Sequence, residues 1–582
     1  MADAKDTAGA THTGKDAAPR TATEAFLTKW RKLYGDAHLA LGREVVARAE
    51  ACASRSPQTP RRHFTERDAL LIAYGDHVHA GPETGLRTLH TFARRRLRAF
   101  SGVHILPHFP FTSDDGFSVV DYRKVDPALG TWEDIRAFAT DFELMFDAVI
   151  NHISASSAWF QGYLQGEEKY EDWFIAADPS DERLARVYRP RATPLLTPFE
   201  RPSGQAFVWT TFSADQIDLN YANPSLAAEI VDLLIDYAER GASYLRLDAI
   251  GFLWKELGTR SFHQPETHLF VQMLRDVFDV ACPNMALVPE INGPYEENLP
   301  YLGNGNNEAQ LVYNFTLPPL ILHAFAAENA RWLGDWLAEV RLPAGSVSLF
   351  NFIASHDGLG VRAAQGLLPE AEMQRLLDAT ERRGAPINYR KGESGELVPY
   401  EINGTLYDLL NDADTPEDEG VARMAVAHCI LFALSGVPGV YFHSLFSTPS
   451  WREGWKVTGH NRTLNRFKFP LAELEAQLDD PQSRASLTLA EITEALSVRR
   501  AHAAFAPGAP QVVLQNLPEA VLAIRRGEEG DSVWCLHNLS TSTVQIKRPL
   551  GARGEVLLRS GRSDAATGDV IELPGLSALW LS

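Results

Sequence analysis

Short apolar runs alternate with amphipathic stretches along most of the chain. The runs have the length and the aliphatic or aromatic content of buried strands, and they cover residues 70–76, 102–107, 144–152, 244–250, 286–291, 311–315, 347–357 and 439–445. Between them, apolar residues recur at helical spacing, as in residues 224–241 and 265–281. Eight strands that alternate with helices predict a parallel sheet closed into a (β/α)8 TIM barrel, an α/β fold. An open doubly wound sheet is disfavoured because no glycine-rich phosphate loop follows the first strand.

Two intervals between the predicted strands, residues 153–223 and 358–420, are longer than a crossover helix needs. Long insertions after barrel strands form the rim of an active site. After a predicted helix near residues 490–502, short runs at 511–516, 520–526, 532–538, 542–547, 554–560 and 577–582 are typical of antiparallel strands. We therefore predict a polar N-terminal tail and helical extension over residues 1–65, a barrel over 66–505 with an inserted rim domain at 153–223 and rim loops at 358–420, and a C-terminal β domain over 506–582.

Composition narrows the class of protein. The net charge of −20 disfavours nucleic acid and anionic membranes as partners, since both select a basic surface. The four cysteines have no metal-ligand or redox spacing, which fits a reducing compartment. The first 24 residues lack the apolar core of a signal peptide, and glycine and proline interrupt the most apolar stretch, residues 424–442. These features predict a cytoplasmic protein.

Two charges interrupt the buried run at residues 244–250. Arg246 and Asp248 are two positions apart, so their side chains lie on the same face of the strand. One interpretation is a structural ion pair at the end of a strand. The other is a carboxylate kept ionised by a cation in a pocket, as in enzymes that poise a nucleophile. This stretch alone leaves both interpretations open.

Other polar residues follow the ends of further predicted strands. They are Glu290, His356, Asp357, Asp147, Asn151 and His152. In a barrel the ends of the strands meet on one face, and so many charges there are difficult to explain by packing alone. A floor rich in carboxylates suits the positive charge that develops in an oxocarbenium-like transition state, which indicates glycosyl transfer.

The same motifs carry a family resemblance. "DAVINH", "YLRLDAIG", "VPEIN" and "FIASHDGLG" resemble, in this order, the motifs of glycoside hydrolase family 13, the α-amylase family. More narrowly, "HILPHFPFTSDDGFSVVDYRKVD", "GTRSF", "YNFTLPPLILHAF" and "GHNRTLNR" resemble the sucrose phosphorylase subgroup, from about residue 65 to the C-terminus. The resemblance implies a TIM-barrel glycosyltransferase, a disaccharide phosphorylase that transfers glucose from a small α-glucoside to inorganic phosphate by double displacement.

The resemblance also implies roles for residues. Asp248 matches the nucleophile, Glu290 the acid/base and Asp357 the transition-state stabiliser; two such carboxyl groups about 5–5.5 Å apart predict retention of configuration. Arg246 is then expected to lower the pKa of Asp248 and to orient it. The other matches form a closed pocket for one glucose unit: His152 and His356 as ligands of sugar hydroxyls, Asp114 and Phe117 as a glucose-pocket pair, and Arg466 at the far end.

Phosphate needs cations in the rim, because arginine forks match phosphate oxygens. The candidates are Arg189 and Arg191 in "YRPR", or Arg382, Arg383, Arg390 and Lys391 in the second rim segment. The alternative for each is an ordinary solvated loop charge.

The acceptor side departs from sucrose phosphorylases. Asn292 stands where they have a histidine, and "LVPYEIN", which includes Tyr400 and Glu401, replaces a segment with an aspartate. Both changes resemble the glucosylglycerate phosphorylases of the subgroup. Sucrose, sucrose 6-phosphate and glucosylglycerol phosphorylases are the alternatives, followed by a hydrolase or transglucosidase with the same triad and by a non-enzymatic amylase-like ectodomain. We expect no cofactor, no metal, no nucleic-acid or membrane partner, and a homodimer.

Overall fold

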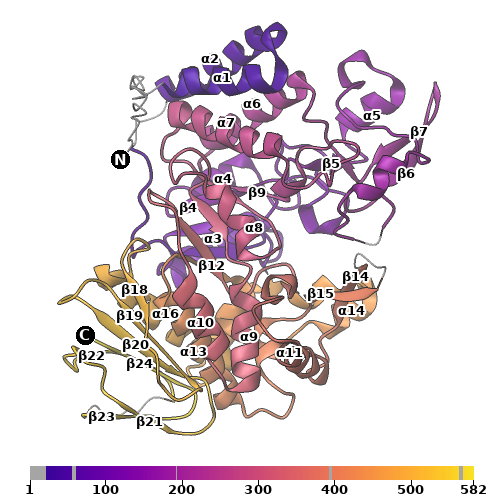
Figure 1. The fold of residues 1–582 in the computed structure, drawn as a ribbon. Coiled ribbons are helices and arrows are strands. Elements are labelled where there is room, and N and C mark those ends of the chain that lie inside the picture. Colours follow the sequence, from indigo (N-terminus) through magenta and orange to yellow (C-terminus); the bar gives the residue numbers. More distant parts are fainter. Residues whose placement is uncertain (1–20, 56–59, 192, 392–395, 563–567) are drawn as a thin grey trace, which may run out of the picture.

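The computed structural model describes residues 21–55, 60–191, 193–391, 396–562 and 568–582. Eight parallel strands form a nearly closed barrel at the centre of the molecule (Figure 1). In chain order they are β1 (Leu70–Ala73), β3 (Gly102–Ile105), β4 (Glu143–Ala148), β9 (Ala242–Leu247), β10 (Ala286–Pro289), β11 (Leu311–Tyr313), β12 (Ser348–Phe352) and β16 (Val437–Tyr441). Each coincides with one of the eight predicted runs, and the predicted TIM barrel is confirmed.

Hydrogen-bonded pairing follows the order β10-β9-β4-β3-β1-β16-β12-β11. The two ends of this sheet meet at Gln310, just before β11. Its backbone N–H donates to the Leu287 carbonyl of β10 (3.2 Å), and its side-chain oxygen accepts from the Leu287 N–H (2.9 Å). A side chain therefore supplies the ladder bond that closes the barrel.

Helices surround the barrel and leave the carboxyl ends of its strands free. They include α3 (Gly85–Arg96), α4 (Trp132–Phe138), α6 (Pro224–Glu239), α7 (Pro265–Ala281), α9 (Leu317–Ala327), α10 (Arg331–Glu339), α13 (Glu417–Ala433) and α16 (Arg484–Ala501). The start of α6 follows from its sequence: the Asn223 side chain accepts from the N–H groups of Ser225 and Leu226, and Pro224 occupies the first turn, where no N–H is needed.

Two segments extend beyond the carboxyl ends of the strands. The first follows β4 and contains α5 (Ala158–Gln165), the hairpin β6 (Leu196–Arg201) and β7 (Gly204–Trp209), and the pair β5 (His152–Ser154) and β8 (Gln216–Asp218). The second follows β12 and contains β13 (Leu359–Gly360), α11 (Glu370–Arg382) and the rim hairpin, β14 (Ile387–Lys391) and β15 (Leu397–Ile402). These are the two long intervals of the sequence, and they bear the rim of the site.

The C-terminal region is an antiparallel sheet, as predicted. Its strands are β18 (Gln511–Val513), β19 (Val521–Arg526), β20 (Val533–Asn538), β24 (Ser577–Leu581) and β22 (Val556–Gly561), in this spatial order. A second sheet pairs β21 (Val544–Lys547), which lies in the predicted run 542–547, with β23 (Val570–Leu573), the strand that sequence reasoning missed. Apolar residues such as Leu536 and Ile571 form a separate small core here. The predicted domain boundaries themselves stay predictions.

Two N-terminal helices, α1 (Ala22–Tyr34) and α2 (Leu39–Arg55), lie over α6 and α7 (Figure 1). Sequence reasoning placed a helical extension within residues 1–65 without giving the bounds of its helices, and α2 packs through a face of small side chains. Gly42 of α2 lies under the Trp30 ring, where a Cβ would come within 2.8 Å of Cδ1. The predicted tail, residues 1–20, lies outside the described residues. None of the described helices is long and apolar enough to cross a membrane.

Candidate active site

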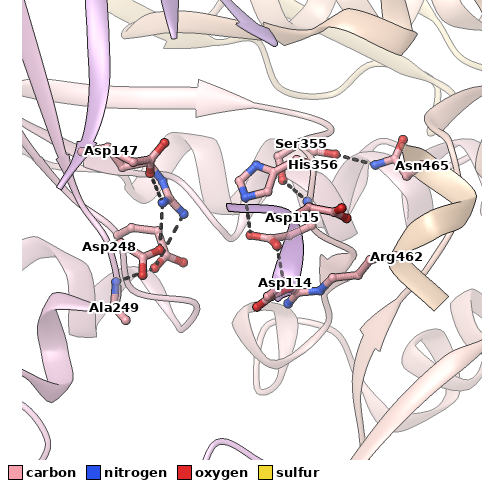
Figure 2. Close-up of polar contacts among 12 residues, drawn as sticks. Asp114, Asp115, Asp147, Asp248, Ala249, Ser355, His356, Arg462 and Asn465 are labelled. Carbon is pink, nitrogen blue, oxygen red and sulfur yellow. Dashed lines mark hydrogen bonds and ion pairs between the residues drawn. The ribbon is translucent and has the colours of Figure 1, made fainter. Parts of the chain in front are cut away.

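Arg246 and Asp248, the two charges that interrupt the buried run at residues 244–250, both line the pocket at the end of β9. Arg246 in β9 is buried, and its Nη1 donates to Oδ1 of Asp248 at 2.8 Å and to Asp147 at the end of β4. Its Nη2 is 3.9 Å from Oε2 of Glu290, which follows β10. Figure 2 shows how Asp147 and Asp248 lie in this part of the site. One buried cation therefore gathers three carboxylates from three adjacent strands, which is more than an isolated structural ion pair.

Backbone geometry reinforces this arrangement. Ala249, directly after Asp248, has a positive φ of 50°, a conformation that alanine rarely adopts. In this conformation its N–H donates to Oε2 of Glu290 at 3.1 Å. The turn after β9 therefore links the two carboxyl groups, one through its side chain and the other through its backbone.

The two carboxyl groups differ in their ionisation. Burial raises the pKa of Glu290 from 4.5 to about 7, helped by the charges of Asp248 and Asp357 and opposed by Arg246. Burial also raises the pKa of Asp248, although Arg246 and His152 act in the opposite direction. Arg246 therefore lowers the pKa of Asp248, as expected, but burial outweighs the cation and the net shift is upward. Since Asp248 alone of the two accepts a hydrogen bond from Arg246, it ionises more readily than Glu290.

Asp357, after β12, is held by cations. Its Oδ1 lies 2.5 Å from Nη1 of Arg462 and 3.7 Å from Nη2 of Arg466. Burial opposes ionisation, but Arg462, His356 and Arg466 together bring the pKa of Asp357 well below its ordinary value. Asp357 is therefore a carboxylate at neutral pH, whereas Glu290 retains a proton up to about pH 7. Figure 2 shows Arg462 beside Asp114.

Two histidines line the pocket and differ in their hydrogen bonds. Burial lowers the pKa of His356 well below its ordinary value, so its ring is neutral. Neither of its ring nitrogens forms a hydrogen bond within the described part of the chain, although both are buried. The ring stacks on Phe117 with centroids 4.9 Å apart. His152 has its Nε2 2.8 Å from the Phe117 carbonyl, which accepts, so this nitrogen carries the proton.

Most of the predicted residues come together in one pocket. Those that line it are Asp114, Phe117, His152, Arg191, Arg246, Asp248, Glu290, Asn292, His356, Asp357 and Tyr400. Sequence reasoning missed further lining residues, of which the main ones are Tyr188, Pro190, Phe212, Gln216, Phe252, Phe262 and Arg462. Four of these come from the first insertion, whose aromatic and proline content was the only signal in the sequence.

The end of the pocket differs from the expectation in one residue. Arg466 was expected to close it, but its Nε donates to the His356 carbonyl (3.0 Å), and its Nη1 pairs with Asp115. Its guanidinium lies directly behind two lining residues, with Nη1 3.9 Å from Asp114 and Nη2 3.7 Å from Asp357, and Arg466 itself lines an adjoining cavity. Arg462, four residues earlier in the same "NRTLNR" motif, is the arginine that lines the pocket.

Of the candidate phosphate ligands, Arg191 is the one that enters the pocket. Its side chain is 39% exposed, and its Nη2 is 3.9 Å from Oδ2 of Asp114. Arg189 does not line the pocket and donates to the Thr193 carbonyl. Arg383 is engaged elsewhere, with Asp412 at 2.9 Å.

Neither Arg382 at the end of α11 nor Arg390 in β14 lines the pocket, and the side chain of Lys391 lies outside the described residues. Within the described residues no group of three histidine, cysteine, aspartate or glutamate side chains could hold a metal ion.

Asn292 also lines the pocket. Its Oδ1 is buried without a hydrogen bond in the described chain, so it is able to accept one from a ligand. Gly360 of β13 packs against it, since a Cβ there would lie 2.2 Å from Oδ1. Behind it, Arg362 Nη1 donates to the Asn292 carbonyl (3.4 Å) and Nη2 pairs with Glu297. The position of Asn292 is therefore fixed by its neighbours on two sides.

Comparisons with known proteins agree with this geometry. A family model described as the α-amylase catalytic domain matches residues 99–342. A glucosylglycerate phosphorylase of Allomeiothermus silvanus is 48% identical over 89% of this chain and 92% of its own length. A sucrose phosphorylase of Agrobacterium vitis is 31% identical over 75% of this chain and 88% of its own. The solved sucrose 6F-phosphate phosphorylase of Thermoanaerobacter thermosaccharolyticum matches with a TM-score of 0.71 and 25% identity, over 81% of this chain and 94% of that one. The chain therefore belongs to the α-amylase family, among its glucosyl phosphorylases.

Proposed function

We propose that this member of the α-amylase family catalyses the reversible phosphorolysis of glucosylglycerate, giving α-D-glucose 1-phosphate and glycerate. The observation that carries the proposal is the high identity to glucosylglycerate phosphorylases over most of the chain, together with a pocket that retains all three acidic residues. Asn292 and the segment Val398–Pro399, where sucrose phosphorylases differ, favour a small acid over fructose as the acceptor.

The first half-reaction uses the two carboxyl groups in different states. Glu290, with a pKa of about 7, gives its proton to the glycosidic oxygen as the C1–O bond breaks. The Asp248 carboxylate attacks C1 from the opposite face and forms a glucosyl ester. Glycerate leaves with the former glycosidic oxygen protonated as a hydroxyl group. The Asp357 carboxylate, which is ionised beside Arg462, stabilises the positive charge on the sugar ring.

The second half-reaction reverses these roles. A phosphate oxygen attacks C1, its proton passes to the Glu290 carboxylate, and the bond from C1 to Asp248 breaks. Two inversions give retention, so the product is the α-anomer. The expected separation of about 5–5.5 Å between the two carboxyl groups stays a prediction.

In this proposal Arg191 binds both anionic substrates, phosphate and glycerate. Phosphate and glycerate occupy the acceptor side in turn, and Arg191 is the candidate phosphate ligand that lines the pocket. An arginine fork binds a phosphate or a carboxylate through two oxygens. A carboxylate on the acceptor therefore compensates for the hydroxyl contacts that fructose makes in sucrose phosphorylases.

The experiment is to incubate purified enzyme with glucosylglycerate, with and without inorganic phosphate. We expect α-glucose 1-phosphate to form with phosphate, and little free glucose to form without it. Equal consumption of the substrate in the absence of phosphate, with release of glucose, would instead identify a hydrolase. Phosphorolysis of sucrose but not of glucosylglycerate would instead identify the enzyme as a sucrose phosphorylase.

The proposal includes a reducing, cytoplasmic compartment and a homodimer. Cys52, Cys282, Cys429 and Cys535 are all free thiols, as expected where disulfides do not form. Gel filtration with light scattering measures the state of assembly.

A further inference from the structure

Arg462 joins two parts of the site that come from different segments. It lies in the turn Asn461–Asn465, and its guanidinium reaches Asp357 through Nη1 (2.5 Å) and Glu401 through Nη2 (2.8 Å). Asp357 follows the barrel strand β12, whereas Glu401 belongs to β15 of the rim hairpin. The residue before Glu401 is Tyr400, which lines the pocket.

Glu401 is fixed on every side. It is 2% exposed, and its second oxygen accepts from Nδ2 of Asn388 (2.9 Å) in the neighbouring strand β14. The Oδ1 of Asn388 accepts in turn from Nδ2 of Asn461 (2.6 Å), the residue before Arg462. A Cβ at Gly358 would lie 2.4 Å from Cγ of Glu401, so the hairpin lies directly on the turn that carries Asp357. These polar contacts link Arg462, Glu401, Asn388 and Asn461 in a closed ring.

A buried glutamate beside a pocket for anions requires a reason. Without a cation, Glu401 would repel phosphate and glycerate and would be costly to bury. Arg462 neutralises it and at the same time provides the shortest cation contact of Asp357 among the described residues. The fork of one guanidinium satisfies both carboxylates, which a lysine ammonium does less well.

We propose that Arg462 is a positioning residue, clamped by Glu401, that orients Asp357 and couples it to the rim hairpin. This inference rests on the proposed function, since Asp357 is its transition-state stabiliser. Strand β15, which carries Tyr400 on the acceptor side, then moves as one unit with the Asp357 carboxylate beside the sugar ring.

The charged and titratable groups around Asp357 set the expected pH effect. They are the cations Arg246, Arg462 and Arg466, the imidazole of His356, and the carboxyl groups of Asp248 and Glu290. Removing Arg462 leaves Asp357 with more distant cations and the same neighbouring carboxylates. The pKa of Asp357 then rises. Once it exceeds the pKa of Asp248, which is the higher of the two in the wild type, activity on the acid side is lost at a higher pH.

The test uses α-glucosyl fluoride as the donor, because its departure needs no proton and its consumption does not depend on phosphorolysis. Arg462→Met should lower the rate by about 100-fold, move the acid limb of the pH profile upward and lower the melting temperature. Arg462→Met combined with Glu401→Gln should recover part of the melting temperature, because the unpaired buried charge of Glu401 is removed, but should not recover the acid limb, because Asp357 still lacks its shortest cation contact. Arg462→Lys should recover part of the acid limb.

Arg383→Met is the matched control, since this buried arginine pairs with Asp412 away from the pocket. It should lower the melting temperature without moving the acid limb. Recovery of both the rate and the acid limb in the double variant would overturn the proposal. Arg462 would then serve only to neutralise the charge of Glu401 and would not position Asp357. If Arg462→Met does not fold, an unchanged acid limb in Arg462→Lys together with full activity overturns it. A wild type that consumes the fluoride without phosphorolysing glucosylglycerate disproves the proposed function alone.

Discussion

The floor and the rim of the pocket are built in different ways. On the floor, Arg246, Asp248 and Glu290 come from adjacent strands of the barrel, and each contacts another of the set. On the rim, Arg191 comes from the first insertion and Tyr400 from the hairpin of the second, and Arg191 is 39% exposed. The floor is fixed by the barrel that carries it, whereas the rim depends on contacts between inserted segments.

This difference in construction matches two tasks, formation of the glucosyl ester on the floor and choice of the acceptor at the rim. Formation of a glucosyl ester requires carboxyl groups held within fractions of an ångström, and strands position side chains better than loops do. The choice of acceptor needs only a few polar groups, and insertions can change these without disturbing the barrel. Floor variants should therefore affect every substrate, and rim variants should affect phosphate or the acceptor selectively.

The largest effect is expected from Asp248→Asn on the floor. The substitution removes the nucleophile at nearly constant volume, so turnover should fall by roughly 10⁴-fold or more for every donor and acceptor. Thermal unfolding should show a folded protein, because burial disfavours the charge of Asp248 and the amide removes it. Retention of a substantial rate in this variant would show that another group forms the covalent bond.

Glu290→Gln should have the second largest effect, and the effect should depend on the donor. Phosphorolysis of glucosylglycerate should fall by about 10²–10⁴-fold, because the leaving group receives no proton. α-Glucosyl fluoride should restore much of the rate, and added azide should give α-glucosyl azide with retained configuration. An inverted azide would identify Glu290 as the nucleophile and reverse the scheme.

The pH profile gives a further test of the floor. Glu290 must be protonated to act as an acid, so the rate of phosphorolysis should fall as pH rises past about 7. Its raised pKa also means that the folded state binds this proton more tightly than the unfolded chain does. The contribution of Glu290 to stability is therefore full below about pH 4.5 and is lost as pH rises through about 7. Glu290→Gln should remove this loss of stability, measured as melting temperature against pH, and a profile unchanged from the wild type would contradict the assignment.

On the rim, two arginines of one segment form a matched pair. Arg191→Ala should raise the KM for phosphate or glycerate by roughly 10–100-fold, the value of one hydrogen bond to a charged group, with a smaller change in kcat. Arg189→Ala should change it by less than about threefold, because its side chain is directed to a carbonyl outside the pocket. The opposite order of the two effects would contradict the placement of the phosphate.

The sequence predicted the floor well for a physical reason. Side chains alternate between the two faces of a strand, and the carboxyl ends of barrel strands all meet on one face of the barrel. Asp248, Glu290 and Asp357 could therefore be placed from this pattern and the family motifs together. What could not be predicted was the balance of burial against charge, which leaves Asp248 with a raised pKa despite Arg246. That balance depends on neighbours from other strands.

The rim was predicted only in part. Its arginines are distinguished by loop conformation, so Arg189 and Arg191 in "YRPR" were equal candidates until the backbone showed that only one lines the pocket. Likewise, "NRTLNR" contains two arginines, and the roles of Arg462 and Arg466 differ because a short turn directs one to Asp357 and Glu401 and the other to Asp115. No periodicity in the sequence carries this information.

The most direct test of the division between floor and rim is a panel of acceptors. Purified enzyme and α-glucose 1-phosphate are mixed in turn with D-glycerate, fructose, fructose 6-phosphate and glycerol, and the release of phosphate is followed. We expect the fastest release with D-glycerate and at least about tenfold slower release with fructose, because Asn292 and Val398–Pro399 lack the partners that fructose would use. A preference for fructose would contradict this account of the rim and would place the chain with the sucrose phosphorylases.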